Sequence, residues 1–280
     1  WVAINAGQDG AWWMAIKHVL LTEAHHQKQV PYFTDYTQKY TDAPYLVELT
    51  KHGATYRAGQ LLRANRLAAY QSVENGDWQF LMWDRNTQRA KMPKGSVGYR
   101  WANKETGKWN LLLEDGVDNS PIDPQLTFLG ESNGVAKVEF DDFGEGRNVF
   151  RDVPVRNIQL ANGSIATVAT VYGLLMAQYG VVRGLGGEYP TSYDDETQAY
   201  TPAWAEKYTG MNRDVIIRFA REWATTAEKT NGRCTVIIGA GINHWYHGNL
   251  MYRAAIQALM FCGCIGVNGG GLAHYVGQEK

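Results

Sequence analysis

Residues 234–280 read CTVIIGAGINHWYHGNLMYRAAIQALMFCGCIGVNGGGLAHYVGQEK, and this stretch decides the fold class. A short β-branched run at residues 235–238 ends in a Gly-Ala-Gly turn, and an apolar segment of helical character at residues 249–262 leads to a second glycine cluster at residues 269–271. The pattern predicts a strand, a tight loop, a helix and a glycine loop. This order places backbone N–H groups at the carboxyl end of a strand and at a helix N-terminus, where an anion such as phosphate can bind.

A similar order opens the chain. Residues 1–4 are typical of the end of a strand, and residues 10–23 of a helix with Asp9 as its N-cap. In the C-terminal half, Asn212 precedes an amphipathic helical pattern that leads into the strand at residue 235. Helices and strands that follow one another at both ends of the chain predict an α/β fold.

The pattern changes between these two ends. Short runs typical of strands are separated by Gly, Asn, Asp and Pro, and they lie at residues 78–83, 98–101, 108–113 and 135–140. The sequence therefore predicts an irregular β-rich insertion within the α/β fold. We expect three segments, which are an α/β segment at residues 1–50, the insertion at 51–157 and a second α/β segment at 158–280.

The composition is that of a soluble protein, with 280 residues of which 45% are hydrophobic and 20% charged. A formal net charge of -1 gives no global electrostatic reason to expect nucleic acid or a lipid surface as a partner. No apolar run reaches the roughly 18 residues that span a bilayer, so we expect no direct insertion into a membrane. The chain starts at Trp1 without a Met and stops at Lys280 directly after a glycine-rich loop, and we expect an internal piece of a longer protein.

The glycine turn at residues 239–241 matches no nucleotide-binding fingerprint. The dinucleotide pattern G-x-G-x-x-G would need a glycine where His244 stands, and residues 239–248 contain no Walker lysine. Two interpretations therefore stay open on the residues alone, a general anion-binding turn and a tight connection from strand to helix.

The cysteines and histidines of this stretch do not form a familiar metal pattern. Cys262 and Cys264 are separated by a helical segment from His244 and His247, which is not the spacing of a zinc finger or ribbon. We interpret the cysteines as small buried hydrophobic residues and predict no metal ligand. The chain also lacks the G-x-S-x-G and H-E-x-x-H motifs of hydrolases, so we assign no catalytic residue.

Longer motifs carry a family resemblance. GAGINHWYH at residues 239–247, FCGCIGVNGGGLAHYVGQEK at 261–280 and SYDDETQAYTPAWAEKYTGMNRDVIIRFARE at 192–222 together resemble the molybdopterin oxidoreductase (DMSO reductase) family. Within that family they are most similar to the catalytic alpha subunits of membrane-bound respiratory nitrate reductases. The resemblance implies Rossmann-like parallel sheet layers, interrupted here by the β-rich insertion, and a molybdenum bis(molybdopterin guanine dinucleotide) cofactor, which is rich in phosphate.

The resemblance also implies which residues bind this cofactor, since glycines permit close approach and imidazoles can donate hydrogen bonds. One side of the cofactor would be lined by Gly239, Ala240, Gly241, Asn243, His244 and His247, and another side by Gly269, Gly270, Gly271 and His274. The family usually has a Pro-Gly-Thr-Asp turn before a helix, and Ala6-Gly7-Gln8-Asp9 stands in the corresponding place of this chain, where Gly7 and Asp9 match the pattern and Ala6 and Gln8 depart from it. In this chain Ala6 precedes Gly7, Gln8 and Asp9, which are implied to meet a guanosine end.

Other parts of the family's machinery have no match in these residues. The His and three Cys that bind a 4Fe-4S cluster, and the aspartate that ligates molybdenum, are expected outside this stretch, and we expect the stretch to be inactive alone. The implied partners are nitrate, an iron–sulfur beta subunit and a membrane quinol-oxidising subunit. The implied location is peripheral, on the cytoplasmic face of the cell membrane, or on the outer face in some archaea.

Two alternatives to a nitrate reductase stay open. Related molybdenum enzymes act on nitrite, on chlorate or perchlorate, or on selenate. A non-catalytic nucleotide-binding module, whose glycine loops hold a simple nucleotide, is the alternative from another class of protein.

Overall fold

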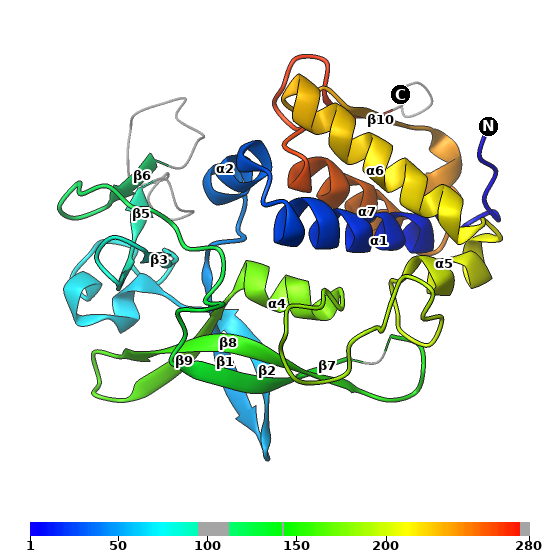
Figure 1. Cartoon of the computed structure of the whole chain (residues 1–280). Coiled ribbons are helices and arrows are strands. Elements are labelled where there is room, and N and C mark those ends of the chain that lie inside the picture. The colour runs from blue at the N-terminus through cyan, green and yellow to red at the C-terminus, as the bar shows by residue number, and fades with distance from the viewer. Residues whose placement is uncertain (95–111, 142, 275–280) are drawn as a thin grey trace. The chain divides into compact units, whose positions relative to one another are not determined.

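The computed structural model describes residues 1–94, 112–141 and 143–274 (Figure 1). The chain forms two compact units. The first unit consists of Trp1–Tyr36, Tyr179–Gly184 and Tyr189–Lys280, and the second of Thr37–Gln178 and Leu185–Glu188. No helix in the described ranges is long and apolar enough to cross a bilayer.

The first unit consists of helices and one parallel pair of strands. Its helical elements are α1 (Asp9–Val19), the π-helix η1 (Leu20–Gln27), the first part of α2 (Pro31–Tyr40), α5 (Pro202–Thr209), α6 (Arg213–Thr230), the short 3-10 helix η4 (Ala240–His244) and α7 (Gly248–Phe261). Helix α1 packs against α5, α6 and α7 (Figure 1).

Local capping signals set the start of two of these helices. The Asn212 side chain accepts a hydrogen bond from the N–H of Asp214 at 2.8 Å and begins α6, as predicted. The Thr201 hydroxyl caps α5 in the same way. At the start of α1, however, Gln8 holds the N-cap position and Asp9 is the first helical residue, so the predicted N-cap role of Asp9 is wrong. Residues 1–4 form no strand, because no described segment pairs with them.

The strands of the first unit are β10 (Thr235–Ile238) and β11 (Gly271–His274). They pair in parallel, with Thr235 opposite Gly271 and Ile238 opposite His274, and α7 connects them. The predicted order of strand, turn, helix and glycine loop is confirmed. The α/β fold class is confirmed with it. Because the two strands run in the same direction, their carboxyl ends meet at one edge.

The second unit contains a closed five-stranded barrel, in the order β1 (Leu46–His52), β2 (Thr55–Leu61), β7 (Gly134–Phe140), β8 (Val149–Gln159) and β9 (Ile165–Thr170). All neighbours are antiparallel except β2 and β7 (Figure 1). Alternation explains how β7 faces the core, since Ala136 and Val138 are buried whereas Val135 and Lys137 are exposed.

Smaller elements complete the second unit. They are the hairpins β3 (Met82–Asp84) with β4 (Arg89–Lys91) and β5 (Pro93–Lys94) with β6 (Leu112–Asp115), the 3-10 turns η2 (Ala64–Arg66) and η3 (Ala68–Tyr70), and α4 (Val171–Gln178).

The predicted β-rich character of residues 51–157 corresponds to this second unit. The strand predicted at 135–140 is confirmed by β7. Of the strand predicted at 78–83, only the last two residues lie in a strand, which is β3. The run at 98–101 and most of the run at 108–113 lie outside the described residues. The division at residues 50 and 158 stays a prediction. The barrel itself runs from β1, which begins at Leu46, to β9, which ends at Thr170.

Candidate functional site

The carboxyl edge of β10 and β11 carries an open backbone turn. After Ile238 the chain turns at Gly239 into η4, whose first hydrogen bond runs from the Ile242 N–H to the Gly239 carbonyl at 3.4 Å. The N–H groups of Ala240 and Gly241 precede that bond and have no partner within the turn. A Cβ placed on Gly239 or Gly241 would meet no atom within 4 Å. The backbone here is open to close approach by a ligand.

The N-terminal turn lies against the same segment. Gly7 has φ +78°, and a Cβ on it would lie 2.8 Å from the ring of Trp245, which follows η4. Only glycine satisfies both the left-handed backbone and this contact. Gln8, which follows Gly7, is half-buried. The structure therefore brings the predicted N-terminal turn and the predicted glycine turn together.

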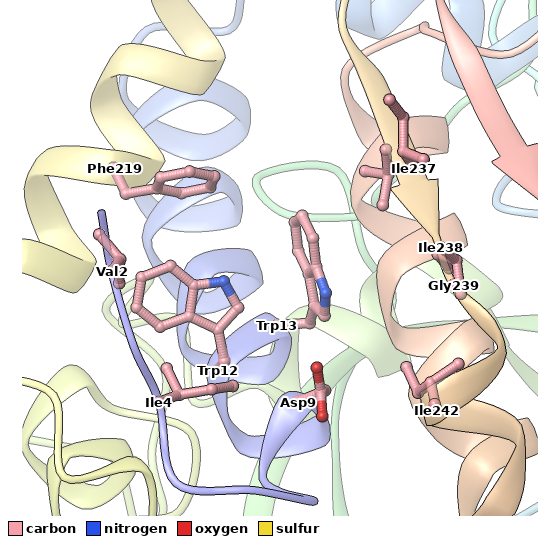
Figure 2. A pocket seen from close by; sticks show the side chains of 12 residues that line it. Val2, Ile4, Asp9, Trp12, Trp13, Phe219, Ile237, Ile238, Gly239 and Ile242 are labelled. Carbon is pink, nitrogen blue, oxygen red and sulfur yellow. The ribbon is translucent and has the colours of Figure 1, made fainter.

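A cavity of about 530 Å³ opens between α1, α6 and β10 (Figure 2). Of the predicted cofactor-binding residues, Asp9, Gly239 and Gly241 line this cavity. Figure 2 shows Trp12 and Trp13 among the side chains that line the cavity, with Asp9 as the charged side chain among those labelled. The cavity is thus a slot lined mainly by apolar side chains, and Asp9 contributes a carboxylate to the lining.

Aromatic packing fixes the walls of this slot. Trp12 and Trp13 are 7% and 9% exposed, and their ring centroids lie 5.3 Å and 6.3 Å from that of Phe219 on α6. Trp13 also packs edge-on against Trp223 at 5.8 Å. We did not predict these residues as part of a site. The sequence does carry one sign of this cavity, because two adjacent tryptophans stand in the first turns of a helix that follows a glycine turn.

Tyr252, which we did not predict as a site residue, links two predicted residues, Asn243 and His274. His274 ends β11, and its Nε2 lies 3.1 Å from the hydroxyl of Tyr252 on α7. The same hydroxyl donates a hydrogen bond to Asn243 Oδ1 in η4. Asn243 and His274 are exposed, and Tyr252 is half-buried. A tyrosine within an apolar helix pattern is ordinarily a packing residue, so the sequence offered no signal for it.

The remaining predicted histidines, His244 and His247, are exposed at the end of η4 and just before α7. The ring of His247 packs against that of Tyr246 at 4.7 Å. Both imidazoles are exposed beside the turn, and neither is used by the protein core.

The second glycine cluster lies at the other edge of the strand pair. Gly271 pairs with Thr235 at the amino end, about 10 Å along the strands from the Gly239 turn. A Cβ on Gly270 would lie 2.3 Å from the carbonyl oxygen of Gly232 and 2.5 Å from that of Cys264. Gly270 thus permits close packing of backbone segments. The structure does not bring residues 269–271 together with the turn, nor with His274 at the opposite end of β11.

The three cysteines are buried and free, as the packing interpretation predicts. Burial raises the pKa of each thiol above its ordinary value, which keeps the thiols protonated and unreactive at neutral pH. Among the described residues, no group of three or more His, Cys, Asp or Glu side chains is arranged to hold a metal ion.

The sequence profile of molybdopterin oxidoreductases matches residues 1–278. The chain belongs to the molybdopterin oxidoreductase family. Membership implies a molybdenum–pterin cofactor.

Several curated relatives of this molybdopterin oxidoreductase chain are nitrate reductase subunits. The respiratory nitrate reductase 1 alpha chain of Escherichia coli (strain K12) is 46% identical over 293 residues, which cover 100% of this chain and 23% of that protein. The nitrate reductase alpha chain of Bacillus subtilis (strain 168) is 40% identical over 282 residues, which cover 100% of this chain and 22% of that protein. The chain thus spans less than a quarter of the length of these relatives.

A more distant relative has another oxyanion in its name. The perchlorate reductase subunit alpha of Dechloromonas aromatica (strain RCB) is 26% identical over 284 residues, which cover 100% of this chain and 24% of that protein.

The residues at the edge fit a phosphate-bearing pterin. Such a group needs hydrogen-bond donors for its phosphate oxygens and flat surfaces beside its rings. The open turn supplies the N–H groups of Ala240 and Gly241, and a Cβ at Gly241 would fill space that the protein leaves empty. The tryptophan slot and Asp9 lie next to this turn in the same cavity. These residues offer hydrogen-bond donors and space to the group, and we assign none of them as a metal ligand.

Proposed function

We propose that this chain is part of the catalytic alpha subunit of a molybdenum-dependent nitrate reductase. In this proposal it supplies part of the shell that binds a molybdenum bis(molybdopterin guanine dinucleotide) cofactor. The observation that carries the proposal is the open glycine turn beside Asp9 at the carboxyl edge of β10, in a chain that is 46% identical over its whole length to a respiratory nitrate reductase alpha chain.

Each element of the edge has a role that its chemistry supports. The N–H groups of Ala240 and Gly241 donate to phosphate oxygens, and the imidazoles of His244 and His247 donate to phosphate or pterin atoms. The Asp9 carboxylate can accept hydrogen bonds from the N1–H and amino group of a guanine. With these contacts, the chain orients the dinucleotide by backbone and side-chain hydrogen bonds.

Asn243 and His274 extend the same shell, and Gly7 with Gln8 shapes the turn that meets the guanosine end. We leave Gly269, Gly270 and Gly271 out of the proposed contact. Gly270 is packed against two backbone carbonyls, and the cluster lies at the opposite edge of the strand pair.

When bound, the cofactor supplies the two-electron chemistry that converts nitrate, with two protons, into nitrite and water. The residues of this chain bind and orient it, and Trp12 and Trp13 line the cavity beside the turn. A 4Fe-4S cluster, an iron–sulfur beta subunit and a membrane quinol-oxidising subunit complete the proposed electron path. The proposed location is peripheral, on the cytoplasmic face of the cell membrane. The word respiratory in the names of several relatives supports this assembly.

The variant Gly241→Leu tests the proposed shell in the complete protein. Gly241 does not have a positive φ, and a Cβ at this position meets no atom within 4 Å, so the larger side chain is compatible with the fold. It would occupy the space assigned to the ligand. We expect the pterin content of the purified protein to fall at least about tenfold, which for a site that is normally full requires the loss of well over about 1.4 kcal/mol of binding free energy.

The control is Ala58→Leu, which places the same side chain at an exposed position of β2. It should leave the pterin content unchanged. Full pterin content in Gly241→Leu would remove the turn from the cofactor shell.

A viologen-linked assay of the complete protein tests the substrate by comparing nitrate with chlorate, perchlorate and selenate. The highest kcat/KM is expected for nitrate. A preference for perchlorate would place the protein with its more distant relative instead. A purified protein that contains no pterin but binds ATP or NAD would support the non-catalytic nucleotide-binding module.

A further inference from the structure

Three elements of the first unit meet at one phenol. Asn243 lies in η4, Tyr252 on α7 and His274 at the end of β11. The Tyr252 hydroxyl is within hydrogen-bond distance of both neighbours, and its ring lies 5.6 Å from the His274 ring. We call this arrangement the Tyr252 bridge.

The single proton of the hydroxyl sets the direction of the bridge. Tyr252 donates to Asn243 Oδ1, and the hydroxyl oxygen is then the acceptor for His274 Nε2. His274 therefore carries its proton on Nε2, which leaves Nδ1 as the second functional atom of the ring. In the same way, the Asn243 carbonyl is turned towards Tyr252, and both N–H bonds of its amide remain available to a ligand.

The bridge acts on side chains that would otherwise be mobile. Asn243 and His274 are exposed, and exposed polar side chains sample several rotamers. Tyr252 is half-buried on the well-packed helix α7, so it is the fixed member. A ligand that binds preset side chains does not have to order them, and this raises its affinity.

We infer that Tyr252 is a positioning residue of the cofactor shell, which holds the Asn243 amide and the His274 imidazole in the orientation that a phosphate-bearing ligand requires. The inference rests on the proposed function, because it takes the ligand from there. It adds a residue that makes no contact with the ligand itself and acts through its two neighbours.

The test uses the complete protein and follows the loss of pterin during incubation in mild denaturant. In Tyr252→Phe the ring remains and the hydroxyl is lost, and we expect pterin to be released about tenfold faster than from the wild type, as for one net hydrogen bond. Tyr208→Phe is the control. Tyr208 is 41% exposed on α5, and its hydroxyl makes no hydrogen bond among the described residues, so its variant should release pterin at the wild-type rate.

A second comparison separates positioning from a general effect on the fold. In a protein that already carries Asn243→Ala and His274→Ala, the bridge has no partners left, so adding Tyr252→Phe should change the release rate less than twofold. A tenfold change in that background would show that the hydroxyl acts on the fold and would overturn the inference. Equal release rates for wild type and Tyr252→Phe would overturn it as well. A wild-type protein without pterin would instead reject the proposed function itself.

Discussion

The substitution Lys17→Met should stabilise the protein at neutral pH. Lys17 lies on α1 and is 1% exposed. Its ammonium donates to Gln257 Oε1 at 2.6 Å and lies 5.2 Å from the centre of the Tyr179 ring, and both of these groups are uncharged. Burial lowers the pKa of Lys17 from 10.5 to about 7. A shift of this size corresponds to about 5 kcal/mol for holding the charged form in the folded state.

The sign of the pH dependence follows from the two pKa values. The unfolded lysine keeps its proton up to about pH 10.5, whereas the folded one releases it near pH 7. Between these values the unfolded state binds more protons, so this residue makes the free energy of unfolding rise with pH, by up to roughly 1.4 kcal/mol per unit. Below pH 7 the full cost of the buried charge is present.

Methionine keeps the length of the side chain and removes the charge, while Gln257 loses one hydrogen bond. We expect Lys17→Met to raise the free energy of unfolding by about 2–4 kcal/mol at pH 6 to 7, with a gain that shrinks towards pH 10. Urea unfolding of wild type and variant across this range measures the difference. Lys229→Met removes an exposed lysine from the last turn of α6 and should change stability by only a few tenths of a kcal/mol. A variant less stable than wild type at pH 6, or a difference that does not vary with pH, would refute the reasoning.

Three further substitutions, one of them paired with a control, test other features of the fold by the same unfolding assay. Burial lowers the pKa of His25 from 6.5 to about 4, so wild type should lose about 3 kcal/mol of stability relative to His25→Leu as the pH falls from 6.5 to 4. Gly270→Ala should cost several kcal/mol because its Cβ meets two carbonyl oxygens, whereas Gly266→Ala, which has φ +83° and open space, should cost about 1 kcal/mol; equal costs would contradict the packing role. Tyr70→Phe removes a hydrogen bond from the buried Asp115 carboxylate and should cost about 1–3 kcal/mol, and no loss would show that the carboxylate is satisfied without it.

The parts of the fold that depend on local signals could be predicted from the sequence. Asn212 caps α6 through its own side chain, and the β-branched run of β10 ends at a glycine turn, as its residues indicate. The barrel could not be predicted in the same way. Its closure depends on β1 pairing with β9 and on β2 pairing with β7, and strands so distant in sequence carry no local mark of their partners.

The candidate site was predictable in its residue types and less so in its geometry. The Gly-Ala-Gly turn at 239–241 and the glycines at 269–271 look alike in the sequence, and only the register of β10 with β11 shows that they lie at opposite edges. The Trp12 and Trp13 walls and the Tyr252 bridge were missed for a related reason. Aromatic residues on apolar helix faces predict packing, and the neighbours that give them another role come from distant segments.

The central claim is that the turn after β10 holds the phosphate-bearing part of a pterin cofactor. An experimental structure of the complete, cofactor-loaded protein tests it most directly. The claim predicts a phosphate oxygen about 3 Å from the N–H groups of Ala240 or Gly241, with the guanine edge at Asp9. A pterin dinucleotide bound elsewhere, with this turn in contact only with solvent or other protein segments, would contradict it.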